Sequence, residues 1–157
     1  MSKQLLVIYK VILITLFTSS ASFAELVKPN NGIEPFLVVK IQLRSLKEND
    51  SPKKDNGIEQ TWEFAHPDNQ KNTGPLGRFK IMIKGKSYKM LLNHLDHKVV
   101  ELKSSDLTAL FEVTILDKDK TYYKFNWTVE KYTAEGALKD CWLTTMVSAP
   151  MSLGSSI

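Results

Sequence analysis

The spacing of apolar residues changes once along the chain. Between Asn31 and Gly85, apolar residues recur every three or four positions, which is typical of helices that bury one face. After Tyr88 they recur at every second position, which is typical of half-buried strands. Helices followed by strands predict an α+β domain, with three N-terminal helices packed on one face of a curved antiparallel sheet of four or more strands.

Three helices are expected before the change of period. They cover residues 31–49, Asn56 to the His66–Pro67 stop, and Thr73 to Gly85. Asn31 with Glu34, and Asn56 with Glu59, fit capping boxes, and Thr73 precedes a first-turn Pro75. The predicted buried stripes are Phe36, Val39, Leu43 and Leu46 in the first helix, Ile58, Trp62 and Ala65 in the second, and Leu76, Phe79 and Ile83 in the third.

Five strands are expected after the change of period. They cover residues 88–92, 98–103, 107–115, 123–129 and 141–147. The connections between them are short and polar, which favours an antiparallel meander. Residues 150–157 begin at Pro150 and are mostly small, so they are expected to form a frayed tail.

The first 24 residues have the pattern of a secretory signal peptide. Lys3 precedes an apolar run from Leu5 to Phe17, and small residues lead to a cleavage site after Ala24. Lys10 interrupts the run, which is shorter than the roughly 18–20 residues of a spanning helix, so no stable membrane anchor is expected. The prediction is export to the periplasm or the medium, with residues 25–149 as a single domain and 150–157 as a flexible tail.

The net charge and the cysteine content exclude two classes of protein, namely nucleic-acid binders and disulfide-stabilised domains. The formal charge of +4 falls to +2 once Lys3 and Lys10 are removed with the signal peptide. Nucleic-acid binding needs a clustered basic face, so no nucleic-acid partner is expected. The single cysteine, Cys141, allows no internal disulfide and is expected to be a small core residue that resists thiol reagents.

The mature chain resembles a known family along nearly its whole length. The matching segments are residues 46–52, 55–58, 64–69, 73–79, 88–94 and 141–144. Their sequences resemble the family named domain of unknown function 4864, although His66 stands where that family often has Ser. The resemblance implies a cone-shaped fold like that of nuclear transport factor 2, and it implies no activity.

The sequence predicts no catalytic residue, cofactor or metal site. His94 and His97 flank Asp96, but a structural zinc site needs about four ligands and no further histidine or cysteine is placed to help. No nucleophile and base are spaced to orient one another.

The cone shape predicts a cavity at the open end of the sheet. Arg78, Tyr88, His94 and Trp142 are the candidate ligand-binding residues, and the expected ligand is small and apolar or weakly anionic. We expect a non-enzymatic binding or interaction module. Two alternatives stay open: an acid–base enzyme that uses the same cavity, and a protein-docking domain whose sheet face binds a partner or a second copy to form a homodimer.

Overall fold

The computed structural model describes residues 25–155. The predicted signal peptide, residues 1–24, lies outside this range. The helices are α1 (Pro35–Lys47), α2 (Asn56–Glu63), α3 (Pro67–Thr73), α4 (Leu76–Lys84) and the 3₁₀ helix η1 (Lys89–Leu91). The strands are β1 (Asp96–Ser104), β2 (Thr108–Leu116), β3 (Thr121–Lys131), β4 (Trp142–Val147) and β5 (Met151–Ser155).

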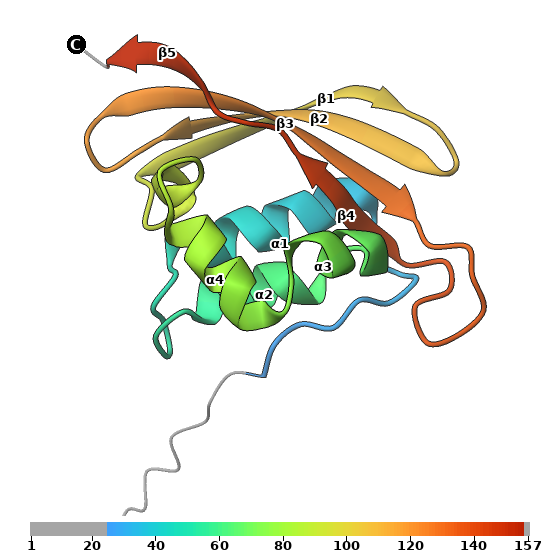
Figure 1. Ribbon diagram of the computed structural model, residues 1–157. Coiled ribbons are helices and arrows are strands. Elements are labelled where there is room, and N and C mark those ends of the chain that lie inside the picture. The colour runs from blue at the N-terminus through green and yellow to red at the C-terminus, as the bar shows by residue number, and fades with distance from the viewer. Residues whose placement is uncertain (1–24, 156–157) are drawn as a thin grey trace, which may run out of the picture.

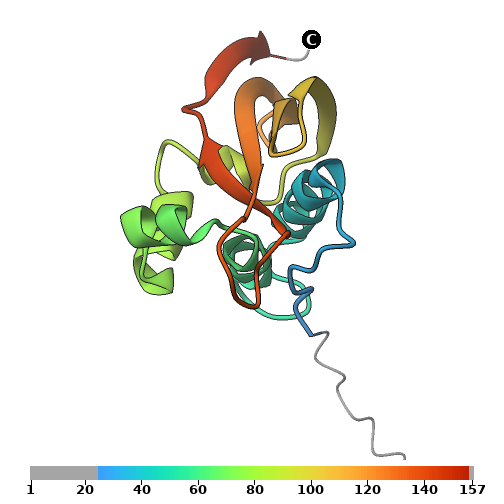
Figure 2. The same ribbon diagram turned by 90° about the vertical axis from the view of Figure 1, so that its right-hand side faces the viewer.

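The five strands form one open antiparallel sheet, which curves over the helices in both views (Figures 1 and 2). Strands β1 to β4 follow one another in the sheet, and β5 pairs with the first residues of β3, beyond the part of β3 that pairs with β4. The α+β class and the antiparallel sheet are therefore as the sequence predicts. The expected frayed tail is not found, because Met151 pairs with Lys124 and Gly154 with Tyr122.

One face of the sheet packs on the helices and forms the core. The alternating residues of β2 and β3 are fully buried on this face, and the buried residues of α1 meet them. The members of this core include Val38, Val39, Leu43 and Leu46 of α1, Phe111, Val113 and Ile115 of β2, and Phe125, Trp127 and Val129 of β3. Phe36 does not belong to it: its side chain is 45% exposed and touches Phe111 from the rim.

Helices α1 and α2 contact each other through their backbones at Gly57. A Cβ at this position would lie 2.1 Å from the carbonyl oxygen of Ser45. Asn49, just after α1, holds the start of α2: its Oδ1 accepts a hydrogen bond from the Ile58 N–H, and its carbonyl accepts one from the Gly57 N–H. The expected capping boxes are therefore wrong, since α1 begins after Glu34 and α2 after Asp55, and neither residue caps through its side chain.

The segment predicted as a strand at 88–92 is helical. Turn-type bonds join the Leu91 N–H to the Tyr88 carbonyl and the Leu92 N–H to the Lys89 carbonyl. Met90 and Leu91 are adjacent in sequence and both are buried, which an alternating strand with one exposed face does not allow. The Asn93 N–H then donates to the carbonyl of Leu46, which ties this turn to the end of α1.

The helix α3 adds a fourth α-helix to the three expected. It has no buried residue, so it leaves no apolar stripe for a periodicity argument to find. Its start depends on capping instead: Pro67 occupies the first turn, and His66 Nδ1 accepts a hydrogen bond from the Asp68 N–H. Among the residues described here, no helix is long and apolar enough to cross a membrane.

Candidate ligand-binding cavity

A cavity of about 100 Å³ lies between the helices and the inner face of the sheet. Residues from all four α-helices, from β3 and β4, and from the η1 turn contribute to its wall. They are Gln42, Leu46, Thr61, Ala65, Asn69, Thr73, Phe79, Met82, Ile83, Tyr88, Leu91, Trp127, Thr144 and Val147.

The floor of the cavity is a buried and uncharged hydrogen-bond network. Gln42 Oε1 accepts hydrogen bonds from Trp127 Nε1 at 3.1 Å and from Thr144 Oγ1 at 2.7 Å. Gln42 Nε2 donates to the Thr61 carbonyl at 3.1 Å, and Trp127 Nε1 also lies 3.2 Å from Thr144 Oγ1. These bonds join α1, α2, β3 and β4, so the floor also fixes the helices on the sheet.

The half-buried lining residues form the mouth of the cavity. They come from α3, α4, the turn before η1, and the end of β4. Tyr88 joins two of these elements, because its hydroxyl donates to the Val147 carbonyl at 3.2 Å. Asn69 Nδ2 donates to the Thr144 carbonyl at 3.3 Å, and Thr73 Oγ1 donates to the Asn69 carbonyl at 2.8 Å. The mouth therefore carries neutral polar groups around an apolar interior.

The described lining contains no carboxylate, imidazole, thiol, amine or guanidinium group. Tyr88 is its single titratable residue, and its hydroxyl is already bonded to a backbone carbonyl. General acid–base catalysis needs a group that can exchange a proton near neutral pH within reach of the ligand. The described lining offers apolar contact and neutral hydrogen-bonding groups.

Of the four predicted site residues, the structure brings only Tyr88 to the cavity. Arg78 is exposed on α4, outside the lining. His94 is buried and bonded to the Leu91 carbonyl of η1, and Trp142 is buried on β4 with Lys131 Nζ 5.1 Å from the centre of its ring. The four residues do not share one concavity.

Alternation along the predicted strand 141–147 would place Trp142 on the opposite face from Cys141, but Cys141, Trp142, Leu143 and Thr144 are all buried. Two neighbours cover this part of β4. The chain at Tyr132 bonds to the Cys141 carbonyl, and the segment after α2 pairs with Thr144 through the His66 N–H and the Phe64 carbonyl. Cys141 is thus buried as predicted, and burial raises the pKa of its thiol.

His94 and His97 form a closed pair instead of a ligand site. A carbonyl can only accept, so His94 Nδ1–H donates to the Leu91 carbonyl at 2.7 Å, and His94 Nε2 then accepts from His97 Nδ1–H at 2.8 Å. Desolvation lowers the pKa of His94, and desolvation with the neighbouring His94 lowers the pKa of His97 to about 4. Both rings are therefore neutral at pH 7.

The floor residues Gln42, Thr61 and Thr144 were not identified from the sequence. Gln42 did carry a signal, because it lies three residues after Val39 and four after Val38, on the buried stripe of α1. A polar residue on an apolar stripe is more informative than another apolar one. Thr144 carried no such signal, because alternation from Cys141 placed it on the opposite face of its strand.

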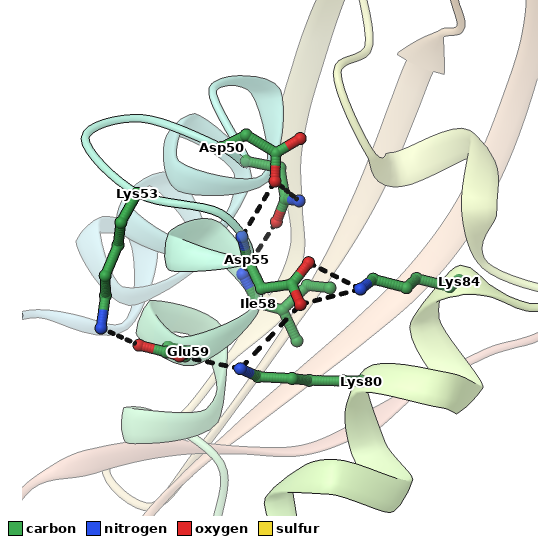
Figure 3. Close-up of polar contacts among 8 residues, drawn as sticks. Asp50, Lys53, Asp55, Ile58, Glu59, Lys80 and Lys84 are labelled. Atoms are coloured by element: carbon green, nitrogen blue, oxygen red, sulfur yellow. Dashed lines mark hydrogen bonds and ion pairs between the residues drawn. The ribbon is translucent and has the colours of Figure 1, made fainter.

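A cluster of ionised side chains lies where α4 crosses the start of α2 (Figure 3), and none of its members lines the cavity. Lys84 Nζ lies 2.7 and 2.8 Å from the two carboxylate oxygens of Asp55, and Lys80 Nζ lies 2.8 Å from Glu59 Oε1. Lys53 reaches Glu59 Oε2 at 2.6 Å. Hydrogen bonds from Lys84 lower the pKa of Asp55, and hydrogen bonds from Lys53 and Lys80 lower that of Glu59.

Within residues 25–155, no three histidine, cysteine, aspartate or glutamate side chains are grouped so that they could hold a metal ion. Comparisons with known protein families, with curated proteins and with solved structures found no match to this chain.

Proposed function

We propose that this protein is a non-enzymatic binding module that holds a small, uncharged, largely apolar molecule in the cavity between its helices and its sheet. The observation that carries the proposal is the described lining, which is apolar with a few amide and hydroxyl groups and has no ionised side chain. Burying an unpaired charge is costly, so such a cavity selects against ionised ligands. The acid–base alternative has no proton-transfer group in the same space.

We propose a narrower class of ligand than the sequence alone indicated. A weakly anionic ligand depended on Arg78, which is exposed outside the lining. A cavity of about 150 Å³ lined by apolar residues binds benzene or xenon. A cavity of about 100 Å³ therefore holds about four non-hydrogen atoms, by scaling from six-atom benzene, and the rest of a five- or six-atom ligand extends into the half-buried mouth.

The test is NMR titration with xenon, cyclopentane and butanoate. The methyl signals of Leu46, Ile83 and Leu91, which line the cavity, should shift with xenon and cyclopentane and stay unchanged with butanoate. Native mass spectrometry of protein from its own host would look for the natural occupant. The proposal fails when neither neutral probe moves these signals, or when butanoate moves them as strongly.

A matched pair of variants locates the binding. Thr73→Phe places an aromatic ring at the half-buried mouth and should abolish the shifts. Thr133→Phe makes the same substitution in the exposed loop between β3 and β4 and should leave them intact.

We further propose that the chain is exported and begins at Glu25 in its mature form. The support is the pattern of Lys3, the apolar run and Ala24 in the sequence. N-terminal sequencing of the protein from its host is the measurement, and retention of residues 1–24 in a membrane fraction contradicts it. We also propose that the fold is a nuclear transport factor 2-like cone, which the order of helices and bent sheet supports. The matching segments between residues 46 and 144 support our proposal that the chain belongs to the domain of unknown function 4864 family.

The second candidate function is docking through the outer face of the sheet. The strand register places the exposed side chains of Val100, Tyr122, Met146 and Met151 on this face. The Lys124–Glu112 ion pair, at 3.3 Å, interrupts the apolar surface between them. Size measurement by light scattering at increasing concentration tests for a homodimer, and Met146→Glu should weaken one that forms by this face.

A further inference from the structure

The floor of the cavity fixes the orientation of the Gln42 amide. An indole N–H can only donate, so the group that faces Trp127 Nε1 must be the oxygen of the Gln42 side chain. The Thr144 hydroxyl donates to the same oxygen. Gln42 Nε2 therefore faces the other way, and it donates to the Thr61 carbonyl.

This orientation leaves one hydrogen-bond donor of Gln42 unused. A side-chain amide nitrogen carries two protons, and among residues 25–155 the Thr61 carbonyl is the single acceptor bonded to Nε2. The Gln42 side chain is fully buried and lines the cavity. A buried donor without an acceptor costs free energy, and an acceptor supplied by an occupant would remove that cost.

We propose, on the basis of the binding function above, that the cavity selects a neutral ligand with a carbonyl or ether oxygen, which accepts a hydrogen bond from the second Nε2 proton of Gln42. The rest of the ligand contacts the apolar wall formed by residues such as Leu46, Phe79, Ile83 and Leu91. Gln42 is thus the specificity-determining residue, while Trp127 and Thr144 position its amide from the oxygen side.

Two probes of nearly the same shape test the proposal. Cyclopentanone and methylenecyclopentane differ in having C=O or C=CH₂, so only the ketone can accept a hydrogen bond. Water also binds the ketone, so raw affinities mix the two effects. The informative quantity is the ratio of the two dissociation constants in the natural protein, compared with the same ratio in Gln42→Met. We expect the ratio to shift towards the ketone by about threefold to tenfold in the natural protein.

A second measurement does not require a variant that folds. The side-chain amide of Gln42 gives two separate proton signals in the natural protein. The ketone should move one of them downfield, and the hydrocarbon should not.

The matched control for the affinity ratio is Gln60→Met, because Gln60 is also a buried glutamine but bonds to Val27 at 2.7 and 2.8 Å outside the cavity. It should leave the ratio unchanged.

The outcomes separate this inference from the proposed function. When both probes shift the cavity signals and the ratio is the same with and without Gln42, the cavity binds ligands but this selectivity is wrong. When neither probe shifts the cavity signals, both proposals fail. A water molecule is then the better candidate for accepting the second Nε2 proton of Gln42. If Gln60→Met changes the ratio of dissociation constants as much as Gln42→Met does, the role of Gln42 is also overturned.

Discussion

Two polar clusters connect the helices of this protein, and they differ in charge and in burial. The cluster of Gln42, Trp127 and Thr144 is neutral and buried beneath the cavity. The cluster of Asp55, Glu59, Lys53, Lys80 and Lys84 is ionised and lies where α4 crosses α2 (Figure 3). Its carboxylates are largely covered, but the side chain of Lys53 is 49% exposed and that of Lys84 is 42% exposed.

This difference predicts which side of the molecule contributes more to its stability. Buried polar groups must be bonded, because water cannot replace a lost partner, whereas the half-exposed lysines of the ion pairs can be solvated when a pair is broken. Changes on the cavity side should therefore have large effects on stability, and changes in the surface cluster small ones.

The largest effect is expected at Phe79, which is buried against Trp62 with ring centroids 5.0 Å apart and lines the cavity. Phe79→Ala should lower the free energy of unfolding by roughly 3–5 kcal/mol, the usual cost of emptying a core aromatic site. Urea unfolding measures this loss as a shift of the midpoint concentration, with the dependence of the free energy on urea concentration unchanged. Ile81→Ala on the same helix is the control, because Ile81 is 75% exposed and its loss should cost at most about 0.5 kcal/mol. Equal losses would show that α4 does not bury Phe79.

Gly57 tests the junction of α1 and α2, on which both clusters depend. A Cβ there would lie 2.1 Å from the Ser45 carbonyl oxygen, so Gly57→Ala must push the two helices apart. We expect a loss of about 1–3 kcal/mol or more, the usual cost of overpacking. Gly77→Ala on α4 is the control: a Cβ there meets nothing within 4 Å, and alanine should add up to about 1 kcal/mol by its helix propensity. A stable Gly57→Ala variant would contradict the close contact.

Sequence reasoning predicted the elements that bury an apolar stripe and missed those that do not. The stripe of Phe79 and Ile83 and the alternating residues of β2 and β3 are buried as predicted. The helix α3 buries no residue, and η1 buries two adjacent ones, so neither shows a regular period. The position of β5 beside β3 is set by long-range pairing, which local pattern does not encode.

The candidate site was harder to predict than the fold. Tyr88 reaches the cavity, but through a turn and not through the strand assigned to it. Arg78 and His94 were chosen because charged or titratable residues often mark sites, whereas this cavity is lined by amides, hydroxyls and apolar groups. A neutral site leaves few signals in a single sequence. Gln42 on the buried face of α1 was the best of them.

The histidine pair should make stability depend on pH between about 6.5 and 4.5. Both pKa values are lowered in the folded protein, that of His97 to about 4, so the unfolded chain binds protons more readily. The groups that face the pair are Lys40 and Lys47, which lower the pKa of His97, and Asp96, which raises it. Stability is therefore full above pH 6.5 and falls as the pH drops towards 4.

Urea midpoints measured between pH 6.5 and 4.5 give the slope of stability against pH. The carboxylates of Asp55 and Glu59 contribute only below about pH 4.5, the ordinary pKa of glutamate, because their pKa values are lowered in the folded state. His97→Asn keeps a donor for His94 Nε2 and removes one titrating group, so its slope should be shallower. A midpoint that does not change between pH 6.5 and 4.5 in the natural protein would contradict the neutral pair.

The smallest effect is expected in the surface cluster. Lys84→Met removes both contacts to Asp55 but keeps a long apolar side chain, and because Lys84 is half-exposed the cost should be at most about 1 kcal/mol. At 1 M salt the Debye length is about 3 Å, so the cost should shrink further. Lys86→Met removes the same charge from an exposed residue with no ion-pair partner within residues 25–155, and it should change nothing measurable.

The pH dependence of the same variant separates the ion pair from a packing effect. Lys84 lowers the pKa of Asp55 in the folded state, so its contribution is present above pH 3.8, the ordinary value, and is lost as the pH falls through the folded pKa. The difference between the natural protein and Lys84→Met should therefore be present at pH 7 and disappear in acid. If that difference persists unchanged at pH 2 and in 1 M salt, the stabilisation comes from the apolar stem of Lys84, and the contrast between a buried neutral cluster and an exposed ionised one fails at this residue.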